Sequence, residues 1–224
     1  MMAFLVARGG YRAQANDQER AMLASLARDV VVLLGSDVEH EAERRAQSVD
    51  PDDPLAALEA DVADIAEAIA TEHEPHTQAP YDKAIDRLLP DMSEDPDEAD
   101  KLRDLTETSV ASQKIENLVT LYQGLDGVAP GSSDIYVPND EAGVWLSALN
   151  DIRLVLAARL DINDDESADA VYERAGLFTG SRSREADDLP EIETADDMLA
   201  VLYAMTTWWQ DSLITAVRNK ALRG

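Results

Sequence analysis

The 224-residue chain contains no cysteine, and this absence excludes several kinds of chemistry. A protein without thiols has no disulfide, no cysteine nucleophile and no thiolate-bound metal site. The sequence also has no apolar run long enough for a transmembrane helix, and the apolar stretch at residues 3–7 is too short for a signal sequence. We therefore expect a cytoplasmic protein that makes no contact with a membrane.

Basic residues are also scarce, because 19 lysines and arginines stand against 46 aspartates and glutamates. The formal net charge of -27 argues against binding to nucleic acids or anionic membranes, both of which need clustered basic residues. A transcriptional regulator, the third candidate function, is disfavoured for the same reason. The acidic charge favours solubility and could steer the protein towards a basic partner.

Motifs of common active sites are missing as well. The chain has no glycine-rich phosphate loop, no nucleophile elbow and no His-Glu-x-x-His helix. His73, Glu74 and His76 lie close together in a proline-bounded segment, which invites a metal-binding interpretation. No third strong ligand has a fixed spacing to these residues, so a solvated loop is the simpler interpretation.

A second metal-binding pattern begins at Asp161, Asn163 and Asp165, which carry oxygen ligands at the first positions of an EF-hand-like loop. Two departures weaken this pattern. Glu166 replaces the glycine of the sharp turn, and Tyr172 replaces the terminal bidentate glutamate. We therefore expect an acidic helix terminus here, and no calcium, other metal or cofactor in the protein.

Hydrophobic periodicity predicts helices along most of the chain. The central helix covers residues 144–160, where leucines on both sides predict burial of both faces. The long helix from residue 95 to Gly124 has small residues at 106–112, which predict either a close crossing by another helix, which we favour, or a bend. The other predicted helices run from Asn16 to Gly35, from Asp53-Pro54 to Ile69, over residues 82–89, around residues 168–175 and from Thr194 onward.

Extended segments are few. Two short pieces around Gly9-Gly10 predict a hairpin, and residues 134–137 predict a strand that can join it in a small sheet. Residues 39–53 predict a loop or a frayed helical turn, and Asn139 is placed to cap the central helix. The prediction is a mainly α, bundle-like single domain over residues 1–224, with about six helices, a minor extended element and a flexible acidic insertion at about residues 161–190.

The candidate functional cluster lies on the central helix and consists of Asn150, Asp151 and Arg153. Such an Asp–Arg arrangement could bind the carboxylate or phosphate of a substrate. The alternative is a buried ion pair between helices, which gives specificity more than stability. In that case we expect Arg153 to pair with Glu107 or Glu116 of the long helix, or with an acid of the segment from Asp82 to Asp91.

These residues also carry a resemblance to a known family. The segment Trp145-Leu-x-Ala148-Leu-Asn-Asp-x-Arg-Leu154, followed by Arg159-Leu160, resembles the most distinctive motif of an actinobacterial domain of unknown function, number two-zero-one-seven. Three other blocks are also similar to that family: Arg87-Leu-Leu-Pro-Asp91, Arg103-x-x-Thr106-Glu107 and Lys114-x-x-Asn117. The resemblance implies no defined activity. Genes of the family often lie beside the Clp protease adaptor that reads N-terminal degrons, which implies a link to regulated proteolysis.

Two functional hypotheses therefore lead. The first is a non-enzymatic protein-interaction or regulatory protein with an unidentified protein partner. The second is a small-molecule or metal-binding protein, and as such an enzyme candidate, built around Asn150, Asp151 and Arg153; a homodimer is compatible with either. A groove lined by apolar side chains and rimmed by acids would favour the first, and a closed pocket where the three side chains converge would favour the second. The adjacent Trp208 and Trp209 cannot share one helix face, so we expect one in the core and the other on a flank or a partner.

Overall fold

A computed structural model describes residues 1–48, 82–91, 93, 95–176 and 192–223. In these residues the chain forms seven α-helices and one antiparallel sheet of three strands. The predicted mainly helical fold with a minor extended element is therefore confirmed. The helix predicted from Asp53-Pro54 lies outside the described residues, as do His73, Glu74 and His76.

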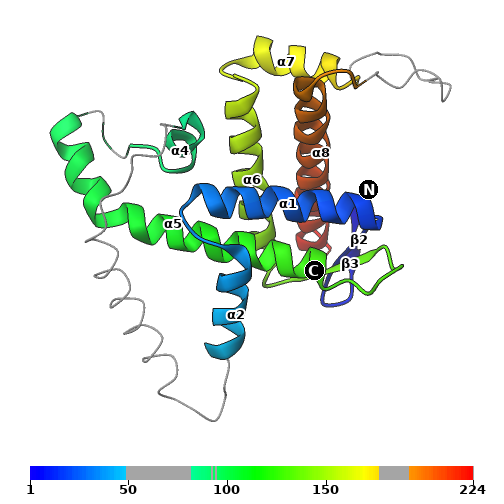
Figure 1. The fold of residues 1–224 in the computed structure, drawn as a ribbon. Coiled ribbons are helices and arrows are strands. Elements are labelled where there is room, and N and C mark those ends of the chain that lie inside the picture. The colour runs from blue at the N-terminus through cyan, green and yellow to red at the C-terminus, as the bar shows by residue number, and fades with distance from the viewer. Residues whose placement is uncertain (49–81, 92, 94, 177–191, 224) are drawn as a thin grey trace.

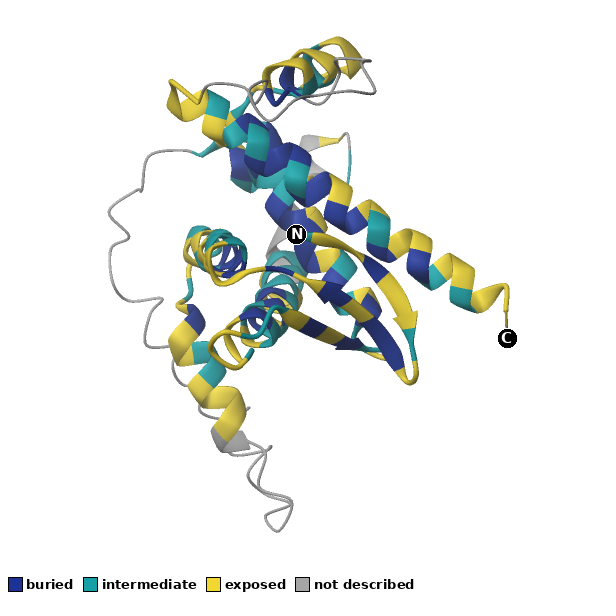
Figure 2. Cartoon of the chain, turned by 90° about the vertical axis from the view of Figure 1, so that its right-hand side faces the viewer, coloured by how far each residue is buried: buried dark blue, intermediate teal, exposed yellow. Residues whose placement is uncertain are grey.

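The N-terminal hairpin forms as predicted. Strands β1 (Met2–Ala7) and β2 (Gly10–Gln14) are antiparallel, and Gly9 in the turn between them adopts a positive φ of 77°. Strand β3 (Asp134–Pro138) pairs with the other side of β2, so the strand order is β1-β2-β3. In β3, and in β2 from Tyr11 onward, buried residues alternate with exposed ones, whereas Phe4 is the one buried residue of β1 (Figure 2).

Helix α1 (Asp17–Leu33) begins and ends where the sequence predicts. Asn16 and Glu19 form a reciprocal capping box at its start. Gly35 follows its last turn with a φ of 88°, a conformation that favours glycine. Both ends of the helix are therefore set by side chains and backbone within a few residues.

Two pairs of helices make up most of the molecule. The other described helices are α2 (Val38–Ser48), α4 (Lys83–Leu88), α5 (Pro96–Asp126), α6 (Ala142–Arg159), α7 (Asp165–Arg174) and α8 (Ala195–Ala221). Helices α1 and α5 lie side by side and cross the antiparallel pair α6 and α8 (Figure 1). Helix α4 packs on α6, and α7 packs on α8. None of the described helices is both long enough and apolar enough to span a membrane.

Helix α2 corrects one prediction, because a loop or frayed turn was expected at residues 39–53. Val38 at its start is completely buried. Arg45 Nη1 donates a hydrogen bond of 2.7 Å to Thr120 Oγ1 of α5. Contacts with α5 therefore stabilise a helix that has no apolar stripe of its own.

The rings of Phe4, Trp145 and Trp209 form a buried aromatic cluster that joins β1, α6 and α8. The ring centroids of Phe4 and Trp209 are 4.7 Å apart, and those of Trp145 and Trp209 are 6.1 Å apart. Trp208 is 46% exposed. The expectation that only one of the two adjacent tryptophans enters the core is confirmed.

The predicted cap of α6 is wrong. Glu141 is the residue at the cap position, and it makes no side-chain capping bond. Asn139 instead donates its N–H to Gly9 O, and its Oδ1 accepts a hydrogen bond of 2.6 Å from Lys220 Nζ. Contacts with the hairpin and α8 thus draw this side chain away from the start of the helix.

Part of the predicted acidic insertion at residues 161–190 is described. It contains α7, which begins with a capping box between Asp164 and Ser167. Arg174 of α7 lies 3.6 Å from Asp196 and 3.7 Å from Asp197 at the start of α8. Residues 177–190 lie outside the described residues.

Candidate functional site

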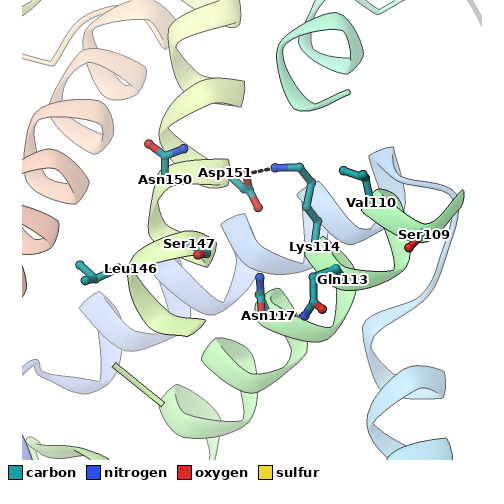
Figure 3. Close-up of a pocket in the computed structure, with 9 residues that line it drawn as sticks. All are labelled: Ser109, Val110, Gln113, Lys114, Asn117, Leu146, Ser147, Asn150 and Asp151. Atoms are coloured by element: carbon teal, nitrogen blue, oxygen red, sulfur yellow. Dashed lines mark hydrogen bonds and ion pairs between the residues drawn. The ribbon is translucent and has the colours of Figure 1, made fainter. Parts of the chain in front are cut away.

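The candidate site lies between α5 and α6, where Asp151 faces Lys114 (Figure 3). Lys114 Nζ donates a hydrogen bond of 2.5 Å to Asp151 Oδ1. The Asp151 side chain is 3% exposed and the Lys114 side chain is 20% exposed. One of the two interpretations of the cluster, a buried ion pair between helices, is therefore present, with Lys114 as the cation.

This ion pair leaves one oxygen of Asp151 unused. Asp151 Oδ2 is buried and has no hydrogen-bond partner among the described residues. Burial raises the pKa of the Asp151 carboxyl above its usual range, and the hydrogen bond and charge of Lys114 oppose this effect only in part. Burial of this half-paired carboxylate in the wall of the site therefore costs free energy of folding.

The prediction that Arg153 pairs with an acid is wrong. Its Nε donates a hydrogen bond of 2.9 Å to Thr207 Oγ1, and its Nη1 donates one of 2.6 Å to Gln210 Oε1. The guanidinium carbon lies 5.7 Å from the ring centroid of Tyr203. All three partners are neutral and belong to α8, whereas Asp151 faces α5. Residues two positions apart on a helix point in directions about 200° apart, so the two side chains meet different neighbours.

Asn150 and Asp151 line a groove of about 640 Å³ between α5 and α6 (Figure 3). Its other lining residues are Ser109, Val110, Gln113, Lys114, Asn117, Leu146 and Ser147. Asn150 is exposed, and Arg153 is not part of the lining. The three residues of the predicted cluster therefore do not converge on one closed pocket.

The groove is open because α5 carries small side chains along this stretch. Thr108, Ser109 and Ser112 are exposed, so the predicted close crossing of another helix is wrong. Figure 1 shows that α5 changes direction along its length, which was the other interpretation of the small residues. Of the small residues in this stretch, Ser109 lines this groove and Thr106 lines the hollow beside it.

A second hollow of about 340 Å³ adjoins the first between α4, α5 and α6. Its apolar lining consists of Leu88, Leu89, Pro90, Val110 and Leu154, and its polar lining of Arg87, Asp91, Thr106, Glu107 and Lys114. Val110 and Lys114 line both hollows. The two hollows are therefore neighbours that share these two side chains, and we call them together the α4–α5–α6 groove, with an apolar part and a polar part.

Two arginines hold α4 at the edge of this groove. Arg159 of α6 donates hydrogen bonds of 2.8 and 2.6 Å to the two carboxylate oxygens of Asp82. This contact lowers the pKa of the Asp82 carboxyl. Arg87 donates to Ile162 O at 2.6 Å and to Asn163 Oδ1 at 2.8 Å. The position of α4, and with it the apolar part of the groove, therefore depends on the end of α6.

The weak calcium candidates are used for other contacts. Asn163 Oδ1 accepts a hydrogen bond from Arg87, and its Nδ2 donates one to Asp161 O. Asp165 lies in the first turn of α7, after the cap residue. No group of three or more acidic or histidine side chains is arranged to hold a metal within the described part of the chain.

The sequence interpretation missed the role of Lys114 and the apolar lining at Leu88, Leu89 and Val110. Lys114 is one of only four lysines, and it lies on a helix stretch of small residues. The sequence signal for this ion pair was an isolated lysine on that stretch of the long helix together with Asp151 on the otherwise largely apolar central helix.

Comparison with protein families identifies the chain. The family model of the domain of unknown function DUF2017 matches residues 1–217. The chain belongs to this family. Comparisons with curated proteins and with solved structures gave no match. In this DUF2017 protein, residues from all four sequence blocks that carry the resemblance line the α4–α5–α6 groove.

Proposed function

We propose that this DUF2017 protein is a binding protein whose α4–α5–α6 groove holds a segment of a partner protein. The observation that carries the proposal is the junction of an apolar hollow and a polar hollow at Val110 and Lys114. Concave sites with an apolar lining and a few fixed polar groups are typical of binding sites. The proposal includes no catalytic step.

The lining of the groove suits a peptide segment. The backbone of a bound peptide needs both hydrogen-bond donors and acceptors, and the side-chain amides of Gln113, Asn117 and Asn150 supply both. An apolar side chain of the same segment would occupy the hollow beside Leu89 and Leu154. The net charge of -27 supports a basic partner, because opposite charges raise association rates.

The family resemblance extends this proposal to regulated proteolysis in the cytoplasm, with a component of the Clp system as the partner. This extension rests on the resemblance alone. The groove supports only the more general proposal of a polypeptide partner.

The test is site-specific photo-crosslinking in the native host, followed by measurement with the purified partner. A photoreactive residue at Val110 should trap a partner that the same residue at exposed Val32 of α1 does not trap. Ser109→Arg fills the groove from an exposed position and should weaken binding of that purified partner at least tenfold. Ser25→Arg, at an exposed position of α1, is the matched control and should bind like the wild type. Equal binding by wild type and Ser109→Arg would rule out the groove as the binding site.

The alternative function is small-molecule binding in the same groove, and the size of the apolar hollow favours it. A volume of about 340 Å³ lies within the range of small-ligand pockets. Native mass spectrometry of the protein purified from its host distinguishes the two functions. A bound mass below about 1 kDa that is lost in Ser109→Arg and kept in Ser25→Arg would establish the alternative.

A further inference from the structure

The outward face of the sheet carries large side chains that no part of the described structure covers. Leu5, Arg12 and Tyr136 are neighbours across the three strands. All three are exposed, Leu5 to 70%. Figure 2 views the molecule from this side and shows exposed residues along the sheet, with α8 beside it. Isolated exposed apolar residues are ordinary, but an adjoining set with an aromatic ring and an arginine is typical of protein interfaces.

A groove of about 560 Å³ continues this face between β1 and α8. One wall includes Leu5, and the other includes Trp208, Asp211, Thr215, Asn219 and Arg223. The spacing of these α8 residues places them along one side of the helix. The exposed indole of Trp208 therefore lies across the groove from the exposed side chain of Leu5.

The charge of this region is opposite to that of the whole protein. The three strands and residues 208–223, that is residues 1–14, 134–138 and 208–223, contain five basic residues and two acids, Asp134 and Asp211, whereas the chain carries a formal charge of -27. Neither Arg12 nor Arg223 forms an ion pair or side-chain hydrogen bond with any residue that the structure describes. Asp134, an acid in the neighbouring row of the sheet, accepts a hydrogen bond from Gln14.

We infer that this surface, formed by Leu5, Arg12, Tyr136, Trp208 and Arg223, docks an acidic segment of a partner protein with interspersed apolar side chains. The apolar side chains enter the groove between Leu5 and Trp208. Carboxylates of the segment pair with Arg12 and Arg223, which are free to form bidentate contacts. Tryptophan, tyrosine and arginine are the residues that most often dominate binding energy in interfaces. We call this set the sheet–α8 surface.

The size of the basic region favours a peptide segment over a membrane or a second copy of the chain. Electrostatic interactions are screened beyond about 8 Å at physiological ionic strength. A short segment therefore meets the basic residues alone. An anionic membrane or another copy of this acidic protein also approaches the surrounding carboxylates, which repel it.

The first step of the test selects peptides from a random library displayed on phage, using the full-length protein. The selected peptides should be rich in aspartate and glutamate between apolar residues. Their affinity, measured by fluorescence anisotropy, should fall at least tenfold in Arg12→Glu, in Arg223→Glu and in Trp208→Ala, and it should fall with added salt. Of the three tryptophans, Trp208 is exposed while Trp145 and Trp209 are buried, so peptide binding should also protect the protein from quenching by iodide.

Matched controls separate this surface from the α4–α5–α6 groove. Arg44→Glu makes the same change of charge on α2 and should bind the peptides like the wild type, as should Ser109→Arg. No enrichment of acidic peptides, or unchanged affinity in Arg12→Glu and Arg223→Glu, would overturn the proposal. Two other outcomes would overturn it in favour of another occupant. One is sedimentation of the protein with phosphatidylglycerol vesicles that depends on these residues. The other is a dimer in analytical ultracentrifugation that the same variants dissociate.

Discussion

The edge of the indole ring of Trp145 on α6 lies against Gly124 on α5. A Cβ atom placed on Gly124 would come within 2.4 Å of Trp145 Cζ2. Trp145 is completely buried, and its ring also packs against Phe4 and Trp209. The absence of a side chain at position 124 therefore lets α5 approach the aromatic cluster.

Gly124→Ala should destabilise the protein although alanine is the better helix former. Overpacking against a rigid ring costs up to about 3 kcal/mol, whereas alanine gains roughly 1 kcal/mol in helix propensity. We expect a net loss of about 2 kcal/mol in the free energy of unfolding, measured by urea denaturation. Gly143→Ala, in the first turn of α6 with no atom within 4 Å of the new Cβ, is the control and should be neutral or stabilising. A stable Gly124→Ala variant would contradict the close packing.

Lys114→Ala should be strongly destabilising because it leaves the buried Asp151 carboxylate without a counter-charge. The loss of one partner of a buried ion pair costs on the order of 3 kcal/mol. The double variant Lys114→Met, Asp151→Leu removes both charges and should recover most of that loss, since apolar replacements of buried pairs are often neutral or stabilising. If the double variant is as unstable as Lys114→Ala, the two side chains stabilise the protein by more than the attraction of their charges.

The stability of the wild type relative to Asp151→Asn should fall as the pH rises above about 4. Burial raises the pKa of Asp151 in the folded state, so the folded protein binds more protons than the unfolded chain in this range. The difference should level off once the pH exceeds the raised pKa. Each unit of that shift corresponds to about 1.4 kcal/mol.

Asp82→Asn provides the control for this pH series. The contact with Arg159 lowers the pKa of Asp82, so the stabilisation that depends on its charge is lost only as the pH falls below about 4. The difference in unfolding free energy between Asp82→Asn and the wild type should therefore not change between about pH 5 and about pH 8, because the folded and unfolded pKa values of Asp82 both lie below this range. A flat profile for Asp151→Asn as well would contradict the raised pKa.

Arg153→Ala should cost about 1.5–3 kcal/mol, which is typical of hydrogen bonds to a charged group. The substitution leaves Gln210 Oε1 without its donor, while Gln210 Nε2 keeps its bond of 2.9 Å to Leu146 O. Arg174→Ala removes only two long, exposed contacts and should change stability by less than about 0.5 kcal/mol. An Arg153→Ala variant as stable as the wild type would instead indicate an arginine kept for a ligand.

Millimolar calcium should leave the Tm of the protein unchanged to within about one degree, the limit expected without binding. The candidate loop residues contribute to the cap of α7 and to the contact with Arg87. The measurement is differential scanning fluorimetry with and without a chelator. A saturable upward shift that the chelator reverses would restore Asp161, Asn163 and Asp165 as a metal site.

Several elements could be predicted from the sequence because their causes are local. The hairpin needs only the Gly9-Gly10 turn and the alternation of its strands. The start of α1 needs only Asn16 and Glu19, which contact each other across three residues. The short helix before Pro90 is likewise fixed by the side chain of Asp82 at its start. Signals of this kind act within one turn of chain, so no knowledge of the packing is needed.

The candidate site depended on tertiary structure. The sequence by itself determined that the central helix carries polar groups that need partners, but not which helix supplies each one. Lys114 and Asp151 are 37 positions apart, and Arg153 and Gln210 are 57 positions apart. The first pairing follows from the crossing of α5 and α6, and the second from the packing of α6 against α8; periodicity specifies neither. Small residues are compatible with a packed crossing or with a hollow, and the packing of the helices around α5 decided that Thr106 and Ser109 line a groove.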